Sequence, residues 1–170
     1  MRLRNLENKD APFMLEWMHD ENIVENLQAN FKDKTLSDCE KFIELSLRDE
    51  ANIHMAIVDD NDIYMGTVSL KNIYNNTAEF AITIRDCAMG KGYSKFAMTE
   101  IIRMGFEEYN LNEIYWCVSP KNRRACKFYD KNDYCRIDID NIDFNKLLNS
   151  FKYTKSEIDK YYWYYVKNDK

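Results

Sequence analysis

The stretch that decides the fold is AEFAITIRDCAMGKGYSKFAMTEII, residues 78–102. It begins with an apolar run typical of a buried strand, and residues 95–109 carry apolar positions at helical spacing. Between the two runs lie Gly90 and Gly92, two of only four glycines in the chain. A strand, a glycine loop and a helix start predict backbone N–H groups that are open to an anion. A tight glycine turn with no ligand remains the alternative.

Neither common nucleotide motif fits this loop. The pattern Gly-x-Gly-x-x-Gly fails because Lys95 stands at its last position, and no Gly-Lys-Ser/Thr follows at the P-loop spacing. The start of a helix still offers unpaired N–H donors and about half a positive charge, which suit a phosphate or pyrophosphate. A short basic segment, KNRRACK at residues 121–127, also suits one small polyanion, although a solvated helix start explains it equally well.

The periodicities around the loop predict a single α+β domain over residues 1–170, with a mixed sheet. Three strands between residues 52 and 85 follow one another through short turns, so most of the sheet is expected to be antiparallel. Residues 78–119 form one parallel β-α-β crossover, which should be right-handed, and helices should cover both faces. The expected strands cover residues 2–6, 52–59, 63–74, 78–85, 113–119, 133–139 and 161–166. The expected helices cover residues 11–20, 35–49, 92–109 and 122–132, with a brief one at 154–157.

The composition narrows the class of partner. Apolar residues make up 45% of the chain, and the net charge of −5 argues against a nucleic-acid-binding protein, which would need a basic surface. No apolar run reaches the roughly 18 residues of a membrane span, and the N-terminus lacks the apolar core of a secretory signal, so we expect a cytoplasmic protein. Five cysteines without a Cys-x-x-Cys pair indicate free thiols, with no metal site.

Two elements, residues 78–102 and residues 111–134, together resemble the GNAT superfamily of acetyl-CoA-dependent N-acetyltransferases. The family's loop pattern, Gln/Arg-x-x-Gly-x-Gly/Ala, falls on the six residues from Met89 to Ser94. Its second pattern, Asn-x-x-Ala-x-x-x-Tyr, falls on Asn122 to Tyr129. The order and spacing of both elements support the resemblance, which extends over about residues 2–135.

Other positions refine this resemblance. Leu6, Asp10 and the run Leu15–Trp17 look like the RimJ/RimL-like branch of the family. Met89 replaces the family's Gln or Arg, and this costs only a side chain, because backbone groups form the cradle. Ser94 replaces a small Gly or Ala and adds a hydroxyl that could touch a phosphate. The family's Gly-Phe, which follows the second element, reads Asp133-Tyr134 here.

The resemblance implies a GNAT-like acyl-CoA N-acyltransferase fold with acetyl-CoA as co-substrate. The pyrophosphate would lie against backbone N–H groups of the glycine loop, formed by Met89, Gly90, Lys91, Gly92, Tyr93 and Ser94. The backbone of Ile82, Thr83 and Ile84, on a strand edge left open where two strands diverge, would bind pantetheine and polarise the thioester carbonyl. Asn122 would contact pantetheine or cap its own helix.

Acetyl transfer to an amine also needs a base for the ammonium and an acid for the leaving thiolate. Glu79, near the start of the same strand, is the candidate base, acting directly or through a water, and a solvated strand position is the alternative. The resemblance makes Tyr129 the candidate acid, with packing as the alternative. A cysteine nucleophile is disfavoured because neither histidine, His19 or His54, lies near a candidate cysteine in sequence; His54 is interpreted as a packed or surface residue.

The sequence therefore predicts an N-acetyltransferase in which the amine attacks acetyl-CoA directly in a ternary complex. The acceptor would be a primary amine of a small molecule, such as an amino sugar linked to a nucleotide, or a protein N-terminus; polyamines and aminoglycosides stay open. Trp17, Phe31 and Tyr74 are candidates for the acceptor pocket, with core packing as the alternative. A monomer or homodimer is expected. The alternatives are a non-catalytic acyl-CoA sensor or interaction module on the same fold and a binder of a different nucleotide phosphate.

Overall fold

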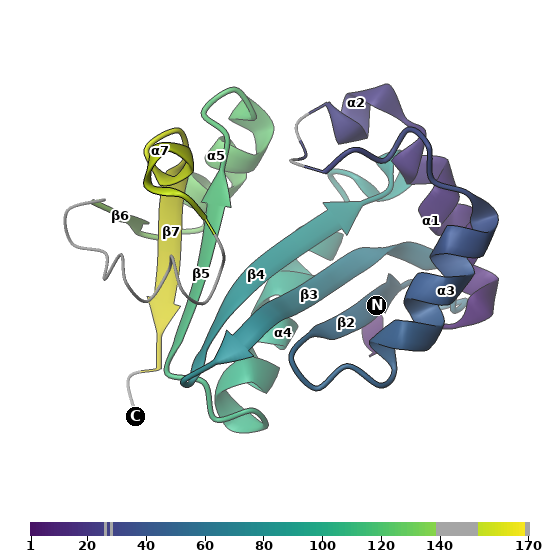
Figure 1. Cartoon of the computed structure of the whole chain (residues 1–170), viewed down its shortest axis with the longest axis horizontal. Coiled ribbons are helices and arrows are strands. Elements are labelled where there is room, and N and C mark those ends of the chain that lie inside the picture. The colour runs from purple at the N-terminus through teal and green to yellow at the C-terminus, as the bar shows by residue number, and fades with distance from the viewer. Residues whose placement is uncertain (26, 28, 139–152, 169–170) are drawn as a thin grey trace.

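The computed structural model describes residues 1–25, 27, 29–138 and 153–168 (Figure 1). Within these residues, seven strands form one sheet in the order β1-β2-β3-β4-β5-β7-β6. The strands are β1 (Arg2–Asn5), β2 (Ile53–Val58), β3 (Tyr64–Tyr74), β4 (Thr77–Ile84), β5 (Glu113–Val118), β6 (Arg136–Ile137) and β7 (Tyr162–Lys167). Neighbouring strands are antiparallel except β4 and β5, which are parallel. The predicted mixed sheet is confirmed; residue 139, the last of one predicted strand, lies outside the described residues.

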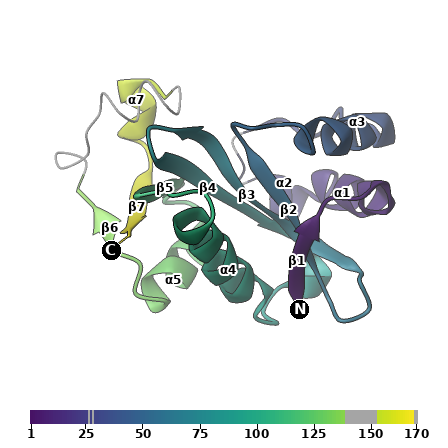
Figure 2. The same cartoon turned by 90° about the horizontal axis from the view of Figure 1, so that it is seen from below.

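The helices cover both faces of the sheet, as expected. They are α1 (Ala11–Met18), α2 (Glu21–Val24), α3 (Leu36–Ser46), α4 (Tyr93–Glu107), α5 (Arg123–Lys131) and α7 (Lys155–Ile158). Figure 2 shows α1 and α3 on one face and α4 and α5 on the other. One apolar core lies beneath α4 and includes Phe80, Ile101 and Trp116. A second core lies beneath α1 and α3 and includes Met14 and Ile43.

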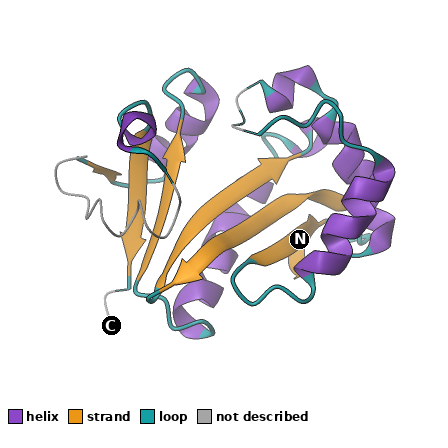
Figure 3. Cartoon of the chain, in the orientation of Figure 1, coloured by secondary structure: helices purple, strands orange, loops and turns teal. Residues whose placement is uncertain are grey.

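The strands β4 and β5 pair over a short distance only. Their register joins Thr77 to Glu113, Ala78 to Ile114 and Glu79 to Tyr115. Beyond these pairs the two strands diverge, which is visible in Figures 1 and 3. On its other side, β4 stays paired with β3 as far as Ile84. The second half of β4, residues 80–84, therefore has one paired edge and one open edge.

A glycine of β3 fixes the position of this open half of β4. A Cβ atom at Gly66 would lie 2.3 Å from the carbonyl oxygen of Thr83, a distance that a real Cβ never shows. Glycine is the residue that permits such a close approach between two backbones. Gly66 thus sets how near β3 can hold the segment around Thr83.

The segment before α1 is held by a buried ion pair. Arg4 donates to both carboxylate oxygens of Asp10, at 2.7 and 2.8 Å. The same carboxylate accepts the backbone N–H of Glu7 at 2.9 Å. Asp10 is 1% exposed, so a charge that would be costly alone is fully paired. Leu6, which is also buried, and Asp10 therefore anchor the entry into α1.

Candidate active site

The glycine loop joins β4 to α4, as the sequence predicts. Gly90 and Gly92 have φ values of 75° and 89°, in the left-handed region that glycine adopts without strain. Gly92 is the N-cap of α4 and has no side chain with which to cap it. The first N–H groups of a helix have no helical partner, and those of Tyr93, Ser94 and Lys95 donate to no other described residue. The loop therefore presents a set of open donors suited to an anion.

The backbone alternation of β4 decides which N–H groups reach its open edge. The N–H group of Arg85 donates to the Met65 carbonyl of β3 at 2.9 Å. Alternate residues of an antiparallel strand face the same partner, so the N–H group of Thr83 also faces β3. Those of Ile82 and Ile84 face the open edge instead. The prediction for Ile82, Thr83 and Ile84 as backbone donors thus narrows to Ile82 and Ile84.

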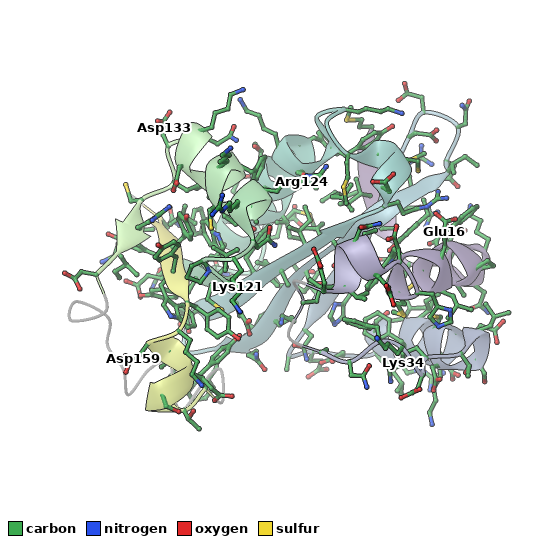
Figure 4. The ribbon with its side chains drawn as sticks, turned by 90° about the horizontal axis from the view of Figure 1, so that it is seen from above. Glu16, Lys34, Lys121, Arg124, Asp133 and Asp159 are labelled. Atoms are coloured by element: carbon green, nitrogen blue, oxygen red, sulfur yellow. The ribbon has the colours of Figure 1, made fainter. Side chains whose placement is uncertain are left out.

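A basic groove of about 360 Å³ connects the open edge of β4 to the start of α5. Met89 of the glycine loop lines it together with Ile82, Thr83 and Ile84 of β4. The opposite wall carries three cationic side chains, Lys121, Arg123 and Arg124, which outnumber the one carboxylate of the lining, Glu25. Figure 4 looks onto this end of the molecule and labels Lys121 and Arg124 beside α5 and Lys34 beside α3. The groove therefore matches a polyanion that lies along β4 and reaches the glycine loop.

A second hollow, the splay groove, occupies the space where β4 and β5 diverge and has a volume of about 380 Å³. Its walls come mainly from residues 79–83 of β4 and 116–119 at the end of β5. The remaining lining residues are Leu27, Ala29, Phe31, Lys71, Asn122, Ala125, Tyr129, Tyr153 and Tyr161. Trp116 Nε1 is buried there and has no hydrogen-bond partner among the described residues. The groove thus combines an apolar interior with the open edge of β4.

Tyr129 of α5 lines the splay groove, as a proton donor to a ligand there would have to. Its side chain is 7% exposed and packs against the rings of Trp116, at 5.4 Å, and Tyr164, at 5.0 Å. No hydrogen bond joins the Tyr129 hydroxyl to the described residues. Burial raises the pKa of Tyr129 well above its usual range. The phenol therefore keeps its proton at neutral pH and can donate it.

Glu79 has a more polar environment than its strand position suggests. It is 6% exposed, so the predicted alternative of a solvated strand position is wrong. Its carboxylate accepts the hydroxyl of Tyr153 at 2.8 Å and the amide of Asn72 at 3.1 Å. Lys71 is directly opposite on β3, and its Nζ lies 3.4 Å from Oε1 of Glu79. Three donors therefore surround the Glu79 carboxylate, and its role as the base stays a prediction.

Asn122 has the capping role that the sequence offered as one of two possibilities. It is the N-cap of α5, and its side-chain oxygen accepts the backbone N–H of Ala125 at 3.0 Å. The same residue lines both the basic groove and the splay groove. Its cap is therefore confirmed, and its contact with pantetheine stays a prediction.

A third hollow, the α1–α3 cavity, lies on the other side of β4 and has a volume of about 250 Å³. It is lined by Met14, Trp17, Met18, Phe31, Lys34, Asp38, Cys39, Phe42, His54, Thr67, Ser69, Ala81, Ile82 and Thr83. Trp17 and Phe31 form part of its wall, whereas Tyr74 lies at the far end of β3 and is 58% exposed. Of the two positions expected for His54, packed or at the surface, the packed one is confirmed, because its ring contacts Phe42 edge-on. Its place in this cavity could not be read from the alternation of β2 alone.

Burial disfavours Cys126 as a nucleophile. The Cys126 thiol is buried and contacts the carbonyl oxygen of Ser119 at 3.7 Å. Burial raises the pKa of this thiol, which opposes the thiolate that a nucleophile requires. Cys117 lines the splay groove with its sulfur 3.7 Å from the Tyr153 hydroxyl, whereas His54 contacts the Ser69 hydroxyl in the α1–α3 cavity.

The fold brings an open strand edge, a glycine loop and a basic groove together in one region of the molecule. A family model described as an acetyltransferase (GNAT) domain matches residues 1–134 of the chain. The protein therefore belongs to the GNAT acetyltransferase family and is an acetyl-CoA-dependent N-acetyltransferase. The open donors of the glycine loop and the apolar splay groove fit the pyrophosphate and the pantetheine of that co-substrate.

Solved structures with the same fold include other acetyltransferases. Spermidine N-acetyltransferase from Vibrio cholerae, in complex with CoA and spermine, is 20% identical, with a TM-score of 0.75 over 98% of this chain and 94% of that one. A GNAT acetyltransferase from Bacillus anthracis is 17% identical, with a TM-score of 0.74 over 99% and 95% of the two chains. No curated protein matches this chain in sequence.

Two further findings concern the described part of the chain only. None of its helices has both the length and the apolar character needed to cross a membrane. It also contains no cluster of three or more His, Cys, Asp or Glu side chains that could hold a metal ion.

Proposed function

We propose that this enzyme acetylates a primary amine of a small molecule by direct attack in a ternary complex. One observation carries the proposal: the splay groove and the α1–α3 cavity share Phe31, Ala81, Ile82 and Thr83. A donor lying in the groove and an acceptor lying in the cavity would therefore meet at the open half of β4. Such a meeting point supplies the proximity that a bimolecular transfer needs.

The donor side uses mostly backbone groups. The pyrophosphate would lie against the N–H groups of the loop from Met89 to Ser94, and pantetheine would pair with Ile82 and Ile84. The thioester carbonyl would accept one of these strand N–H groups, which polarises it. Met89 brings no polar end to the loop, so the three cations at the start of α5 would supply the charge for the phosphates.

The leaving thiolate would receive its proton from Tyr129. The hydroxyl lies in the groove that would hold pantetheine, and burial keeps it protonated. Asn122, at the junction of the two donor-side grooves, would contact the pantetheine arm. Glu79 remains the sequence-based candidate for the base.

The acceptor cavity favours an amine carried on an uncharged body. Its walls include the rings of Trp17, Phe31 and Phe42, and its carboxylate, Asp38, is bonded to the hydroxyl and N–H of Thr35. A polyamine brings further charges, and a charge enters an apolar cavity at a high cost unless it is paired. An amino sugar suits such a wall better, and a protein N-terminus is the next candidate. At about 250 Å³ the cavity would hold the amine-bearing end only of a nucleotide-linked sugar.

The remaining sequence-based expectations belong to the same proposal. Trp17 lines the cavity, and Leu6 and Asp10 anchor the helix that carries it, which supports the RimJ/RimL-like branch. The strands of the sheet come from both ends of the chain, which supports one domain over residues 1–170. We place the enzyme in the cytoplasm as a monomer or homodimer.

Two measurements test the proposed function. Calorimetric titration should give acetyl-CoA binding well below hundreds of micromolar, and ATP or NAD should not compete. Thiol release should then be followed with a panel of glucosamine, nucleotide-linked amino sugars, spermidine, spermine, an aminoglycoside and a peptide with a free N-terminus. Turnover fastest with an amino sugar is the expected result. Binding without turnover would support the non-catalytic sensor, and turnover fastest with spermine would contradict the acceptor class.

A further inference from the structure

A row of three residues crosses the sheet at the floor of the α1–α3 cavity. In the strand register, His54 of β2 lies opposite Ser69 of β3, and Ser69 lies opposite Ala81 of β4. Directly opposed side chains project from the same face of a sheet. All three residues line the cavity. The row therefore leads from an imidazole to the open half of β4, where donor and acceptor would meet.

The two polar members of the row are hydrogen-bonded to each other. His54 Nδ1 lies 2.7 Å from the hydroxyl oxygen of Ser69. Neighbouring strands are about 4.8 Å apart, so Ser69 stands between the imidazole and Ala81. Because Ala81 ends at Cβ, it leaves space above β4 next to the hydroxyl. An amine that occupies this space would be next to Ser69.

The surroundings of His54 favour the neutral imidazole. The ring packs edge-on against Phe42 of α3, with ring centres 4.9 Å apart. The charged groups that face it are Asp49, before β2, and Lys71, on β3, while Lys34 and Asp38 line the same cavity. Burial lowers the pKa of His54 below its ordinary value of 6.5, and Lys71 acts in the same direction, whereas Asp49 opposes it. A neutral imidazole at pH 7 can accept a proton.

Glu79, by contrast, belongs to the other end of β4. It lies in the half that is paired with β5, opposite Tyr115, and it lines the splay groove rather than the α1–α3 cavity. Tyr153, Asn72 and Lys71 surround its carboxylate. A base has to reach the amine on the acceptor side. The pair formed by Ser69 and His54 lines the cavity and meets this condition, and Glu79 does not.

We propose that the Ser69–His54 pair, rather than Glu79, accepts the proton that the acceptor ammonium must lose. This inference rests on the proposed function, because it assigns the acceptor to the α1–α3 cavity. The ammonium gives its proton to the Ser69 oxygen, directly or through one water, while the Ser69 proton passes to His54 Nδ1. His54 thereby becomes an imidazolium and later returns the proton to solvent.

The remaining bonds balance without any further reactant. The nitrogen lone pair that this transfer frees forms a bond to the acetyl carbon, and the bond from that carbon to sulfur breaks. The electron pair of the broken bond goes to sulfur, which takes a proton from the Tyr129 hydroxyl. The second proton lost by the nitrogen goes to solvent, and Tyr129 recovers its own proton from solvent.

The experiment compares pH profiles of four variants, with acetyl-CoA and the fastest acceptor of the amine panel. Wild-type kcat/KM should fall at acid pH with a midpoint below 6.5. His54→Gln should lose this acid limb and about 100-fold in kcat at pH 7, with the KM for acetyl-CoA unchanged. Ser69→Ala should lose about tenfold in kcat, and Ser69→Thr, which keeps a hydroxyl, should recover most of it. Glu79→Gln should keep the acid limb. An acid limb that survives in His54→Gln, or disappears in Glu79→Gln, would overturn the proposal.

A second measurement needs no acceptor. The imidazole resonances of the free enzyme, assigned by comparison with His54→Gln, should titrate below pH 6.5 and move in Ser69→Ala. A His54 ring that titrates at or above 6.5 would overturn the proposal independently of turnover. If the wild-type enzyme acetylates no amine while His54 titrates below pH 6.5, the proposed function fails. The neutral state of His54 beside Ser69 would still be confirmed. Calorimetry with acetyl-CoA checks that each variant remains folded and able to bind.

Discussion

The splay groove and the α1–α3 cavity lie on either side of the same strand, yet they are built differently. The groove includes the exposed backbone edge of β4, and it shares Ile82, Thr83 and Asn122 with the basic groove, which Met89 of the glycine loop also lines. The cavity is lined by side chains from α1, α3, β2, β3 and β4, which helix packing and strand register bring together. A binding site made of backbone tolerates substitutions such as Met89, whereas one made of side chains changes with each of them. We therefore expect the binding site for the donor to be shared across the family and the binding site for the acceptor to be specific to this chain.

Gly66→Ala should affect both hollows at once, because it disturbs the strand that they share. The added Cβ would stand 2.3 Å from the Thr83 carbonyl oxygen, so β4 must shift. A displacement near 1 Å at a reacting centre can cost about 100-fold, which is the loss in kcat/KM that we expect. Steady-state kinetics with both substrates would measure it, and thermal unfolding should show a Tm lower by several degrees.

Gly105→Ala is the matched control for this change. A Cβ there would meet only the side-chain ends of Ile114, Leu70 and Leu111, at 3.0 to 3.2 Å. Alanine also favours the helix by about 1 kcal/mol, which offsets the crowding. Activity lost equally in both variants would mean that the position of β4 is not what Gly66 protects.

Tyr129→Phe should separate the chemistry of the splay groove from its binding. The ring that packs on Trp116 is kept, and only the hydroxyl is lost. Without its acid the reaction should slow by about 100- to 10,000-fold in kcat, with the KM for acetyl-CoA within about threefold. Stopped-flow or steady-state thiol release would measure this, and an unchanged kcat would remove the role of Tyr129.

Tyr134→Phe is the control for Tyr129→Phe. Its ring also contacts Trp116, with ring centres 5.3 Å apart, but Tyr134 is not among the residues that line the groove. Near-wild-type kinetics are expected. If Tyr134→Phe and Tyr129→Phe were equally slow, the effect would come from the aromatic packing rather than from a proton donor.

Arg124→Ala should have a smaller effect, confined to the donor side. An exposed cation near a phosphate contributes up to about 1 kcal/mol, so the KM for acetyl-CoA should rise about three- to fivefold with kcat unchanged. The difference from wild type should shrink at high salt, since added ions screen exposed charges. Arg103→Ala removes an exposed cation that pairs with Glu107 on α4 instead, and its KM should stay at the wild-type value. A similar rise in both variants would count against the basic groove.

Asp62→Asn should lower the stability of the fold and leave both hollows unchanged. Lys9 and Arg4 hold the pKa of Asp62 at about 2, below its usual 3.8. A carboxylate with a lowered folded-state pKa stabilises the fold above its unfolded value, and the contribution is lost as the pH falls from about 4 to about 2. Urea unfolding should therefore show Asp62→Asn less stable than wild type at pH 6 and the two converging toward pH 2. An equal gap at every pH would contradict this linkage, and unchanged turnover serves as the check on location.

Local sequence patterns were sufficient for most elements of the fold, for the position of the glycine loop and for the cap of α5. Glycines at a strand-to-helix junction and an N-cap asparagine act through backbone geometry close to them in sequence, so Gly90, Gly92 and Asn122 lie where they were expected. The partners of Glu79 could not be predicted in the same way. Tyr153 reaches it from 74 residues downstream, and only the register of β3 on β4 places Lys71 opposite it.

The acceptor side depends on register still more strongly. Alternation predicts which residues of a strand share a face, but it does not predict which residues of two strands lie opposite each other. The contact between His54 and Ser69 needs the register of β2 on β3, and the cavity needs α1 and α3 to settle above it. The position of His54 thus followed from tertiary structure, for which a single strand holds no signal.

The placement of the tryptophans gives each hollow its own optical reporter. Trp17 lines the α1–α3 cavity, Trp116 lines the splay groove, and Trp163 packs with Ile158 in a separate cluster. These are the three indoles of the chain. Indole emission depends on local polarity. The double variant Trp163→Phe/Trp17→Phe would keep only Trp116, which would report on binding of the donor. The double variant Trp163→Phe/Trp116→Phe would keep only Trp17, which would report on binding of the acceptor. The order in which the two substrates enter could then be followed without a label.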